Sequence, residues 1–300
     1  MKTPSTTSDG PWTILSLLKW TTAYFSSHGI DNPRSTAEVL LAHVLELKRI
    51  DLYLQYDRPM HADELKSYKQ LIKRRVAREP VAYITGTREF WSLDFKVNRH
   101  VLIPRPETEC LVEAALAIIE NKGGSDPLFI LELGTGSGAV VTALASQAPG
   151  HRYYASDISI EALKVARQNS ASLGQAGINF FAGHWLAPVR CSKGCFDLIV
   201  SNPPYICRTD IKDLQPEIQR YEPIQALDGE VDGLGALRRI IASAPDCLVS
   251  GGSLLLEIGY GQKAVVEAIA RQAGCFDEVS FDRDYSGIHR VARMRKMPVK

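Results

Sequence analysis

A glycine-rich segment near residue 134 has residue types that could bind a cofactor. It reads Ile130-Leu131-Glu132-Leu133-Gly134-Thr135-Gly136-Ser137-Gly138-Ala139. Glycine is needed where a backbone approaches a ligand closely or takes a positive φ angle. Asp157 follows Gly138 by 19 residues, and a carboxylate there can accept hydrogen bonds from both hydroxyls of a ribose. The segment therefore predicts a site for a ribose-containing cofactor.

Two cofactors fit these residues. Gly134, Gly136 and Ala139 satisfy the G-x-G-x-x-G/A pattern of dinucleotide-binding proteins, in which an acid follows about 20 residues later. The same glycines, together with Asp157, also fit a site for S-adenosylmethionine (SAM). Glu132 favours SAM, because an acid attracts its cationic aminoacyl group and would repel a pyrophosphate. These residues favour SAM over a nicotinamide cofactor but leave both open.

A second motif, Asn202-Pro203-Pro204-Tyr205, follows the apolar run 196–201. Two prolines fix φ twice and remove two N–H donors, so this loop is stiff and offers carbonyl oxygens. A planar amide or exocyclic amine attacks poorly, but its two N–H bonds are good donors. If the Asn202 side chain and the Pro203 carbonyl accept these two hydrogens, the nitrogen is directed at a methyl group. Both hydrogen bonds strengthen as positive charge develops on that nitrogen in the transition state. Pro204 and Tyr205 would complete the acceptor pocket, so the motif favours N-methylation without a strong general base.

Both motifs lie in a region where expected strands and helices alternate. Strands are expected near 129–133, 152–156, 178–182, 196–201, 253–258, 276–282 and 288–295. Helices are expected near 139–148, 159–172, 234–248 and 262–273. Such alternation predicts a parallel sheet covered on both faces, with ligands at the carboxyl ends of the strands. The last two strands have only a short connection and should pair antiparallel, which gives a seven-stranded Rossmann-like sheet. Residues 206–232 are expected to form a long, mostly irregular segment after the second motif.

The first 80 residues have helical periodicity. Helices are expected over 12–28, from a capping box at Ser35-Thr36-Ala37-Glu38 onward, and over 62–78. The last of these has an outer face rich in Lys and Arg, which we interpret as solvated, with docking on an acidic surface or on RNA as the alternative. Pro80 ends the helical pattern, and β-rich runs on either side of Gly86 predict a hairpin. We therefore expect a helical domain over 1–80, a hairpin linker over 81–100 and the sheet domain over 101–300.

The composition is that of an ordinary globular protein, with 300 residues, 45% hydrophobic and 23% charged. The 35 Lys and Arg residues against 34 Asp and Glu give a net charge of +1, so no overall field draws the chain to nucleic acid or to anionic lipid. No apolar run reaches the roughly 18 residues of a membrane span. Residues 1–10 lack the features of a signal or transit peptide, and we expect a frayed terminus.

The six cysteines are scattered, and only Cys191 and Cys195 lie close together in the sequence. No second pair at zinc-like spacing accompanies them, so no metal site is expected. The chain is long enough to build a core without cross-links. We therefore expect reduced thiols in a cytoplasmic protein.

With these motifs, the chain resembles the protein-(glutamine-N5) methyltransferases that modify peptide chain release factors, the HemK or PrmC family. The resemblance covers nearly the whole chain and is most specific in the small helical front domain and in one motif, Leu102-Ile103-Pro104-Arg105-Pro106-Glu107-Thr108-Glu109. It also includes the glycine segment, the Asn-Pro-Pro-Tyr motif and Leu254-Leu255-Leu256-Glu257-Ile258-Gly259. Asn-Pro-Pro-Tyr alone is shared with adenine and other amino methyltransferases.

The resemblance implies a class I SAM-dependent methyltransferase domain and a role for each matching residue. Residues 134–138, including Thr135 and Ser137, would pass beneath the methionine part of SAM, and Asp157 would hold the ribose. Trp185 would lie beside the adenine, and Asn202 would sit between methyl donor and acceptor. Arg105 and Glu107 belong to a segment that resembles the border of the family's active site.

The resemblance also implies a substrate, the glutamine of the Gly-Gly-Gln motif in class I release factors. This implies a protein partner, no direct DNA substrate, no membrane and a monomeric enzyme. Two residues depart from the family pattern. His184 stands where Asp is common, so the adenine contact there is not carried over, although neutral imidazole or backbone can substitute. Glu132 replaces a more usual Asp and is one methylene longer.

Three other functions compete with this interpretation. A nucleic-acid amino methyltransferase would share Asn-Pro-Pro-Tyr, but such enzymes need a basic groove, because phosphate contacts supply most of the affinity. A binding module that retains SAM without catalysis is disfavoured by the intact motifs. A nicotinamide oxidoreductase would need a hydride-transfer site, and no candidate residues for one are found in the sequence.

Overall fold

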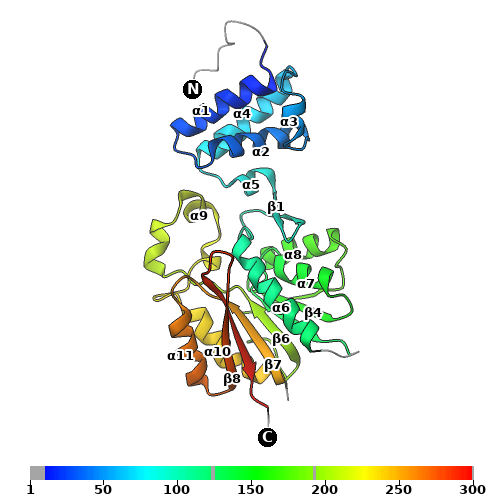
Figure 1. Ribbon diagram of the computed structural model, residues 1–300, viewed down its shortest axis with the longest axis vertical. Helices are drawn as coiled ribbons and strands as arrows, with labels where there is room; N and C mark the ends of the chain where they lie inside the picture. Colours follow the sequence, from blue (N-terminus) through cyan, green and yellow to red (C-terminus); the bar gives the residue numbers. More distant parts are fainter. Residues whose placement is uncertain (1–10, 123–125, 192–193, 299–300) are drawn as a thin grey trace. The chain divides into compact units, whose positions relative to one another are not determined.

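The computed structural model describes residues 11–122, 126–191 and 194–298. The expected frayed terminus, residues 1–10, lies outside them. The chain divides into two compact units, coloured along the sequence in Figure 1. The helical unit comprises Met1–Gly86 together with Pro216–Tyr221, and the sheet unit comprises Thr87–Gln215 and Glu222–Lys300.

Six helices lie in the described part of the helical unit, and the first five of them share one apolar core. They are α1 Ile14–Ser27, α2 Pro33–Leu45, α3 Asp51–Leu54, α4 Ala62–Val76, α5 Val81–Thr85 and α9 Pro216–Tyr221. Phe25 of α1, Leu41 of α2 and Tyr68 of α4 are almost fully buried in the core. The Tyr68 hydroxyl donates to the carbonyl of Ala37 at 3.0 Å. The core therefore joins α1, α2 and α4, as the helical periodicity predicted.

The start of α2 differs from the sequence expectation. The helix begins at Pro33 rather than after Ser35, and it has no side-chain cap. Proline favours the first helical turn, where its missing N–H is not needed. Glu38 does not serve a capping box, because its buried carboxylate pairs with Arg34 Nε at 3.0 Å and with Arg49 Nη2 at 2.5 Å. The capping-box prediction was therefore wrong.

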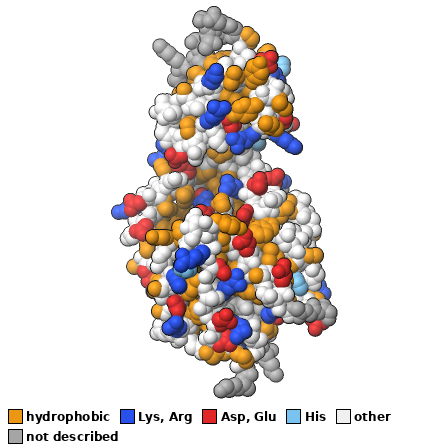
Figure 2. Space-filling model, in the orientation of Figure 1, with side chains coloured by type: hydrophobic (Ala, Val, Ile, Leu, Met, Phe, Trp, Pro, Cys, Tyr) orange, Lys and Arg blue, Asp and Glu red, His pale blue; other side chains and the backbone are white. Residues whose placement is uncertain are grey.

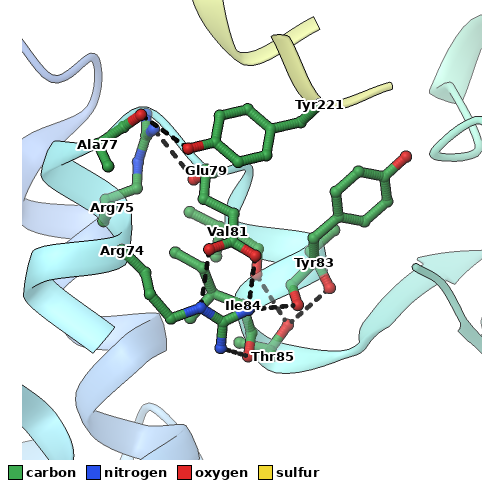
Figure 3. A network of polar contacts seen from close by, with 10 residues as sticks. Arg74, Arg75, Ala77, Glu79, Val81, Tyr83, Ile84, Thr85 and Tyr221 are labelled. Atoms are coloured by element: carbon green, nitrogen blue, oxygen red, sulfur yellow. Dashed lines mark hydrogen bonds and ion pairs between the residues drawn. The ribbon is translucent and has the colours of Figure 1, made fainter. Parts of the chain in front are cut away.

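Residues 81–85 form helix α5, not the first strand of a hairpin. Pro80 stands at its N-cap, and Gly86 ends it in the left-handed region at φ 78°. Figure 3 shows Arg74 between the carboxylate of Glu79 and the end of this helix, where it donates to the carbonyls of Tyr83 and Ile84 at 3.2 and 3.4 Å. The β-rich composition of the segment was overridden by this cap and by burial of Tyr83 and Ile84.

Part of the cationic face expected on α4 is paired within the helical unit rather than solvated. Arg75 is buried, and its Nη2 donates to Glu217 of α9 at 2.8 Å. Arg78 donates to the same carboxylate at 3.3 Å. The Tyr221 hydroxyl at the end of α9 donates to the Ala77 carbonyl at 2.9 Å (Figure 3). A short segment from the second half of the chain is thereby held in the N-terminal unit.

The sheet unit opens with a hairpin of β1 Thr87–Phe90 and β2 Leu93–Lys96. Its turn lies at Trp91 and Ser92, with φ 55° and 56°, as in the two-residue turns that match strand twist. The main sheet has the order β5-β4-β3-β6-β7-β9-β8. Its strands are β3 Phe129–Leu133, β4 Arg152–Asp157, β5 Asn179–Ala182, β6 Phe196–Ser201, β7 Leu248–Glu257, β8 Phe276–Arg283 and β9 His289–Lys296. The first five in this order run parallel, and β9 pairs antiparallel with β7 and β8.

Helices cover both faces of this sheet (Figure 1). They are α6 Glu109–Asn121, α7 Ala139–Gln147, α8 Ile160–Ser172, α10 Gly235–Cys247 and α11 Lys263–Ala273. One apolar cluster joins α6 and α7 to Ile130 on β3, and the other joins α10 and α11 to Leu131 and Leu133. Alternate residues of β3 thus face opposite layers, which confirms the predicted seven-stranded α/β sheet.

Two connections differ from the sequence expectations. Residues 206–232 contain the short helices η2 Arg208–Asp213, α9 and η3 Ile224–Ala226, so the segment is more regular than predicted. Cys191 and Cys195 form a disulfide, with Cα atoms 5.7 Å apart. Their spacing in the loop before β6 brings the thiols together, so the expectation of reduced thiols was wrong for this pair. Cys110, Cys207, Cys247 and Cys275 are free.

No helix within the described residues is long and apolar enough to cross a membrane.

Candidate active site

A cavity of about 470 Å³ opens at the carboxyl ends of β3, β4, β5 and β6, wholly within the sheet unit. Neighbouring strand ends meet there because β3 lies between β4 and β6. The Ser201 hydroxyl donates to the Leu133 carbonyl at 2.7 Å and ties the ends of β6 and β3 together. The cavity lining includes these sequence-predicted site residues: Gly134, Gly136, Asp157, His184, Trp185, Asn202 and Pro204.

The glycine loop has a backbone conformation that is unfavourable for residues with a side chain. Gly134, Gly136 and Gly138 have φ of 69°, 55° and 79°, in the left-handed region. A Cβ on Gly138 would stand 3.0 Å from Ala166 Cβ, so this glycine allows α8 to pack closely. A Cβ on Gly136 would meet nothing within 4 Å, and Gly136 borders the cavity. The loop therefore presents bare backbone to a ligand.

Asp157, at the end of β4, is held by two backbone donors. Its Oδ2 accepts from Gly136 N at 2.9 Å, and its Oδ1 accepts from Ser159 N at 2.8 Å. Burial raises the pKa of this carboxyl, and these backbone hydrogen bonds oppose the rise. Asp157 therefore fixes the glycine loop and, because it also lines the cavity, is placed to accept from a bound hydroxyl.

Glu132 does not border the cavity. Its buried Oε2 accepts from the Thr135 hydroxyl at 2.5 Å and from Val141 N at 3.2 Å. Burial raises its pKa to about 8, although the hydrogen bonds from Thr135 and Val141 lower it. Ser137 is also buried, and its carbonyl accepts from Asn169 Nδ2 at 2.8 Å. Glu132, Thr135 and Ser137 thus shape the loop from within.

Trp185 follows β5 and has a positive φ of 53°. Its ring lies over the glycine loop, because a Cβ on Gly134 would meet Trp185 Cζ3 at 3.4 Å. The buried Trp185 Nε1 has no hydrogen-bond partner in the described chain. His184 lines the cavity beside it, with the two ring centroids 5.8 Å apart. This part of the cavity wall is therefore aromatic, and the Trp185 Nε1–H is a hydrogen-bond donor without a partner in the described chain.

The Asn-Pro-Pro-Tyr motif lies directly after β6 at the same edge. Asn202 and Pro204 line the cavity, and Asn202 Nδ2 donates to the Thr108 hydroxyl at 3.1 Å. Pro203 is buried behind them. Tyr205 is not among the residues that line the cavity, and its hydroxyl donates to Glu257 Oε1 at 3.3 Å. The motif therefore presents an oriented amide to the cavity.

The border residues expected from the sequence have different environments. Arg105 Nη2 donates to Glu222 Oε1 at 2.6 Å, and Glu222 Oε2 accepts from Ile103 N at 3.2 Å. Glu107 is exposed. Neither Arg105 nor Glu107 is in the cavity lining. Arg105 instead fastens the segment before η1 Pro106–Thr108 to the chain that re-enters the sheet unit at Glu222.

Sequence reasoning assigned no role to Thr108, Glu222, Glu257 or Gln262. Gln262 Nε2 donates to the Tyr205 carbonyl at 3.1 Å, and Glu257 is a buried acid at the end of β7. Only Glu257 had a local signal, a carboxyl group after an apolar strand. The cavity lining also contains two ion pairs, Arg208–Asp228 at 2.9 Å and Arg239–Glu230 at 2.5 Å.

Two family models match the chain. Residues 16–86 match the PrmC N-terminal domain, and residues 125–255 match a methyltransferase domain. The structure is similar to that of the human METTL16 catalytic domain in complex with an RNA hairpin of the MAT2A 3′UTR, with a TM-score of 0.57 and 14% identity over 93% of each chain. The N-terminal domain of human METTL16 in complex with SAH gives a TM-score of 0.52 and 14% identity, over 91% of this chain and 93% of that one. These likenesses confirm the methyltransferase fold.

Relatives similar over nearly their whole length identify the family. A release factor glutamine methyltransferase of Geobacter sulfurreducens is 41% identical over 280 residues, which cover 93% of this chain and 95% of the relative. One from Vibrio cholerae is 42% identical over 282 residues, with the same coverage of each chain. One from Rhodopirellula baltica is 35% identical over 97% of this chain and 99% of the relative. With its helical front unit, its methyltransferase sheet and an oriented Asn-Pro-Pro-Tyr amide, the chain belongs to the family of release factor glutamine methyltransferases.

Proposed function

We propose that this enzyme transfers a methyl group from SAM to the side-chain amide nitrogen of the glutamine in the Gly-Gly-Gln motif of class I release factors. The observation that carries the proposal is the placement of Asn202 in the cavity wall, with its Nδ2 already bonded to Thr108. Its Oδ1 is then the atom available to an acceptor nitrogen. Family membership supports the same reaction.

The residues around the cavity fit SAM. Gly136 offers backbone with room where a side chain would stand, Asp157 would accept from the ribose hydroxyls, and Trp185 would lie against the adenine with its unused Nε1 donor. Bound there, the cofactor supplies an electrophilic methyl group on a cationic sulfonium. Because Glu132 is buried behind the glycine loop, we assign it to holding that loop rather than to direct contact with the aminoacyl group.

The reaction needs little more than orientation of the acceptor. Asn202 Oδ1 and the Pro203 carbonyl would accept the two hydrogens of the glutamine amide and direct its nitrogen toward the methyl group. Both hydrogen bonds strengthen as the nitrogen becomes positive, so they stabilise the transition state more than the ground state. The nitrogen releases its proton after transfer, and the chain therefore needs no strong general base.

A protein substrate fits the surface better than a duplex nucleic acid. The net charge is +1, and on the face drawn in Figure 2 the sheet unit carries basic and acidic side chains interspersed. Phosphate backbones require clustered cations. We propose that the helical unit binds the release factor, that the enzyme works as a monomer and that it acts in the cytoplasm, where its substrate is used.

Mass spectrometry of a release factor after incubation with SAM and the enzyme tests the proposal. We expect one added methyl group, located by fragmentation on the glutamine of Gly-Gly-Gln. A release factor in which asparagine replaces that glutamine is the matched control and should gain no methyl group. If the enzyme labels DNA or RNA from radioactive SAM but no release factor, the proposal is wrong.

A further inference from the structure

A single side chain joins three loops at the edge of the sheet where the cavity opens. Gln262 stands after β7 at the start of α11, and its Nε2 donates to the carbonyls of Tyr205 at 3.1 Å and Gly233 at 3.2 Å. Its Oε1 accepts from Gly259 N at 2.8 Å. A backbone carbonyl only accepts and a backbone N–H only donates, so one orientation of the Gln262 amide satisfies all three contacts. Gln262 therefore connects the loop after β6, the loop before α10 and the loop after β7.

Glycines allow these loops to approach Tyr205 closely. A Cβ on Gly233, whose φ is 74°, would stand 2.5 Å from the Tyr205 carbonyl oxygen. A Cβ on Gly229 would stand 2.9 Å from the Tyr205 carbonyl carbon, and one on Gly259 would stand 3.0 Å from Tyr205 Cδ2. Non-bonded carbon atoms at optimal separation are about 3.5–4.0 Å apart. A larger residue in place of Gly229 or Gly233 would therefore push its own loop and Tyr205 apart.

The chain that leaves the Asn-Pro-Pro-Tyr motif is paired with residues 227–233, the segment that carries two of these glycines. Gly229 N donates to the Ile206 carbonyl at 2.8 Å, and Arg208 N donates to the Glu230 carbonyl at 2.8 Å. Arg208 and Glu230 both line the cavity. The motif and this part of the cavity wall are therefore fixed to each other, and the glutamine amide contacts both segments.

We propose that Gln262 is a positioning residue for methyl transfer, which holds the Tyr205 backbone so that the Asn-Pro-Pro-Tyr motif directs the acceptor nitrogen at the methyl group. Gln262 is not among the described residues that line the cavity, so it acts through the motif and not by touching the substrate. Proline fixes φ but not ψ, so the loop needs an anchor beyond its two prolines. A displacement of about 1 Å at a reacting group can cost about a hundredfold in rate. The kinetic consequence rests on the proposed function, but the anchoring of the loop does not.

Matched glutamine variants test the kinetic part. Gln262→Met keeps the length of the side chain and removes its three hydrogen bonds, and Gln272→Met makes the same change at an exposed site on α11. With a release factor as substrate, we expect Gln262→Met to lower kcat about 10- to 100-fold, while the KM for SAM changes less than about threefold. Equal kcat values for the two variants would overturn the proposal. A comparable loss of SAM affinity in Gln262→Met would also overturn it, because general damage to the site would then explain the loss of kcat.

A second pair of variants displaces Tyr205 without changing Gln262. Gly233→Ala places a Cβ at positive φ and against the Tyr205 carbonyl, whereas Gly274→Ala places one at a similar φ of 67° with nothing within 4 Å. Backbone strain is therefore alike in the two variants, and only Gly233→Ala disturbs the loop. We expect Gly233→Ala to lower kcat by a factor within about threefold of that for Gln262→Met, and Gly274→Ala to retain kcat within about twofold. Wild-type kcat in Gly233→Ala would contradict the positioning role.

Amide hydrogen exchange, followed by nuclear magnetic resonance in ¹⁵N-labelled enzyme, tests the anchoring without any substrate. The Gly259 amide loses its acceptor in Gln262→Met, but the amides of Gly229 and Arg208 keep theirs. We expect exchange at all three to become about tenfold faster or more, because the loops open locally more often, while Gln272→Met leaves the three rates unchanged. Unchanged rates at Gly229 and Arg208 would refute the anchoring. If the wild-type enzyme methylates no release factor, the proposed function fails, while the exchange rates still decide this inference.

Discussion

The two loops that shape the cavity are fixed by opposite means. The loop after β3 depends on backbone conformation, with three glycines at positive φ and with Asp157 accepting the Gly136 N–H. The loop after β6 contains no glycine and is fixed by prolines and by side chains from distant segments, Thr108 and Gln262. The first arrangement leaves bare backbone for a cofactor, and the second leaves one oriented amide for chemistry. Cofactor binding and catalysis should therefore respond separately to substitution.

Substitution of Asn202 should give the largest difference between the effect on catalysis and the effect on SAM binding. Asn202→Ala should lower kcat for release factor methylation by about a thousandfold or more, because it removes an acceptor that acts at the developing positive charge. The affinity for SAM, measured by isothermal titration calorimetry, should change less than about threefold. Asn121→Ala on the exposed end of α6 is the control. Substantial residual turnover in Asn202→Ala would contradict the mechanism.

Alanine substitutions at two glycines of the loop after β3 distinguish the cost of backbone strain from the cost of steric crowding. Gly136→Ala and Gly138→Ala both place a Cβ at positive φ, which costs about 1–2 kcal/mol. Only the alanine at 138 also meets the backbone of α8, 3.1 Å from Ala166 Cα, and such overpacking adds about 1–3 kcal/mol. Urea denaturation should show a loss of about 3 kcal/mol for Gly138→Ala and about half of that for Gly136→Ala. Equal losses would show that α8 yields to the added methyl group.

A substitution of Asp157 tests whether the glycine loop and its carboxylate affect SAM binding without affecting the rate of methyl transfer. Asp157→Asn keeps the shape but removes the charge, and its Nδ2, which only donates, would face the N–H of Gly136 or of Ser159. Loss of hydrogen bonds to the charged group costs about 1.5–3 kcal/mol. The Kd for SAM should rise about 10- to 100-fold, while kcat at saturating SAM stays within about threefold. A fall in kcat with an unchanged Kd would remove the distinction between the two loops.

The same contrast explains what the sequence could predict. The glycine loop, Asp157 and the two prolines act through local backbone conformation, so their residue types and spacing were enough to place them at one sheet edge. The hydrogen bonds of Thr108 with Asn202 and of Glu257 with Tyr205 span 94 and 52 residues, and no local pattern reveals them. The assignment of residues 81–85 to a strand failed for a related reason, because Arg74 and burial of Ile84 overrode local β propensity.

A buried glutamate contacts each loop, Glu132 at the glycine loop and Glu257 at Tyr205, and pH distinguishes the two. Burial raises the pKa of Glu132 to about 8 and that of Glu257 to about 7, from an ordinary value of 4.5. Between pH 4.5 and these raised values the folded protein binds more protons than the unfolded chain, so the free energy of unfolding falls as pH rises. Each group contributes a slope of at most about 1.4 kcal/mol per pH unit.

Between pH 7 and 8 most of this slope should come from Glu132, because Glu257 passes from half ionised to mostly ionised in the folded state over this interval, while Glu132 is still at least half protonated. Glu132→Gln should therefore flatten the fall in stability over this interval by about 0.5 kcal/mol per pH unit or more, whereas Glu257→Gln should flatten it mainly below pH 7. Urea denaturation at half-unit pH steps measures both slopes, with the exposed Glu120→Gln as the control. If Glu132→Gln keeps the wild-type slope from pH 7 to 8, the carboxyl behind the glycine loop is already ionised at neutral pH, and the loop is fixed by a charge rather than by a neutral acid.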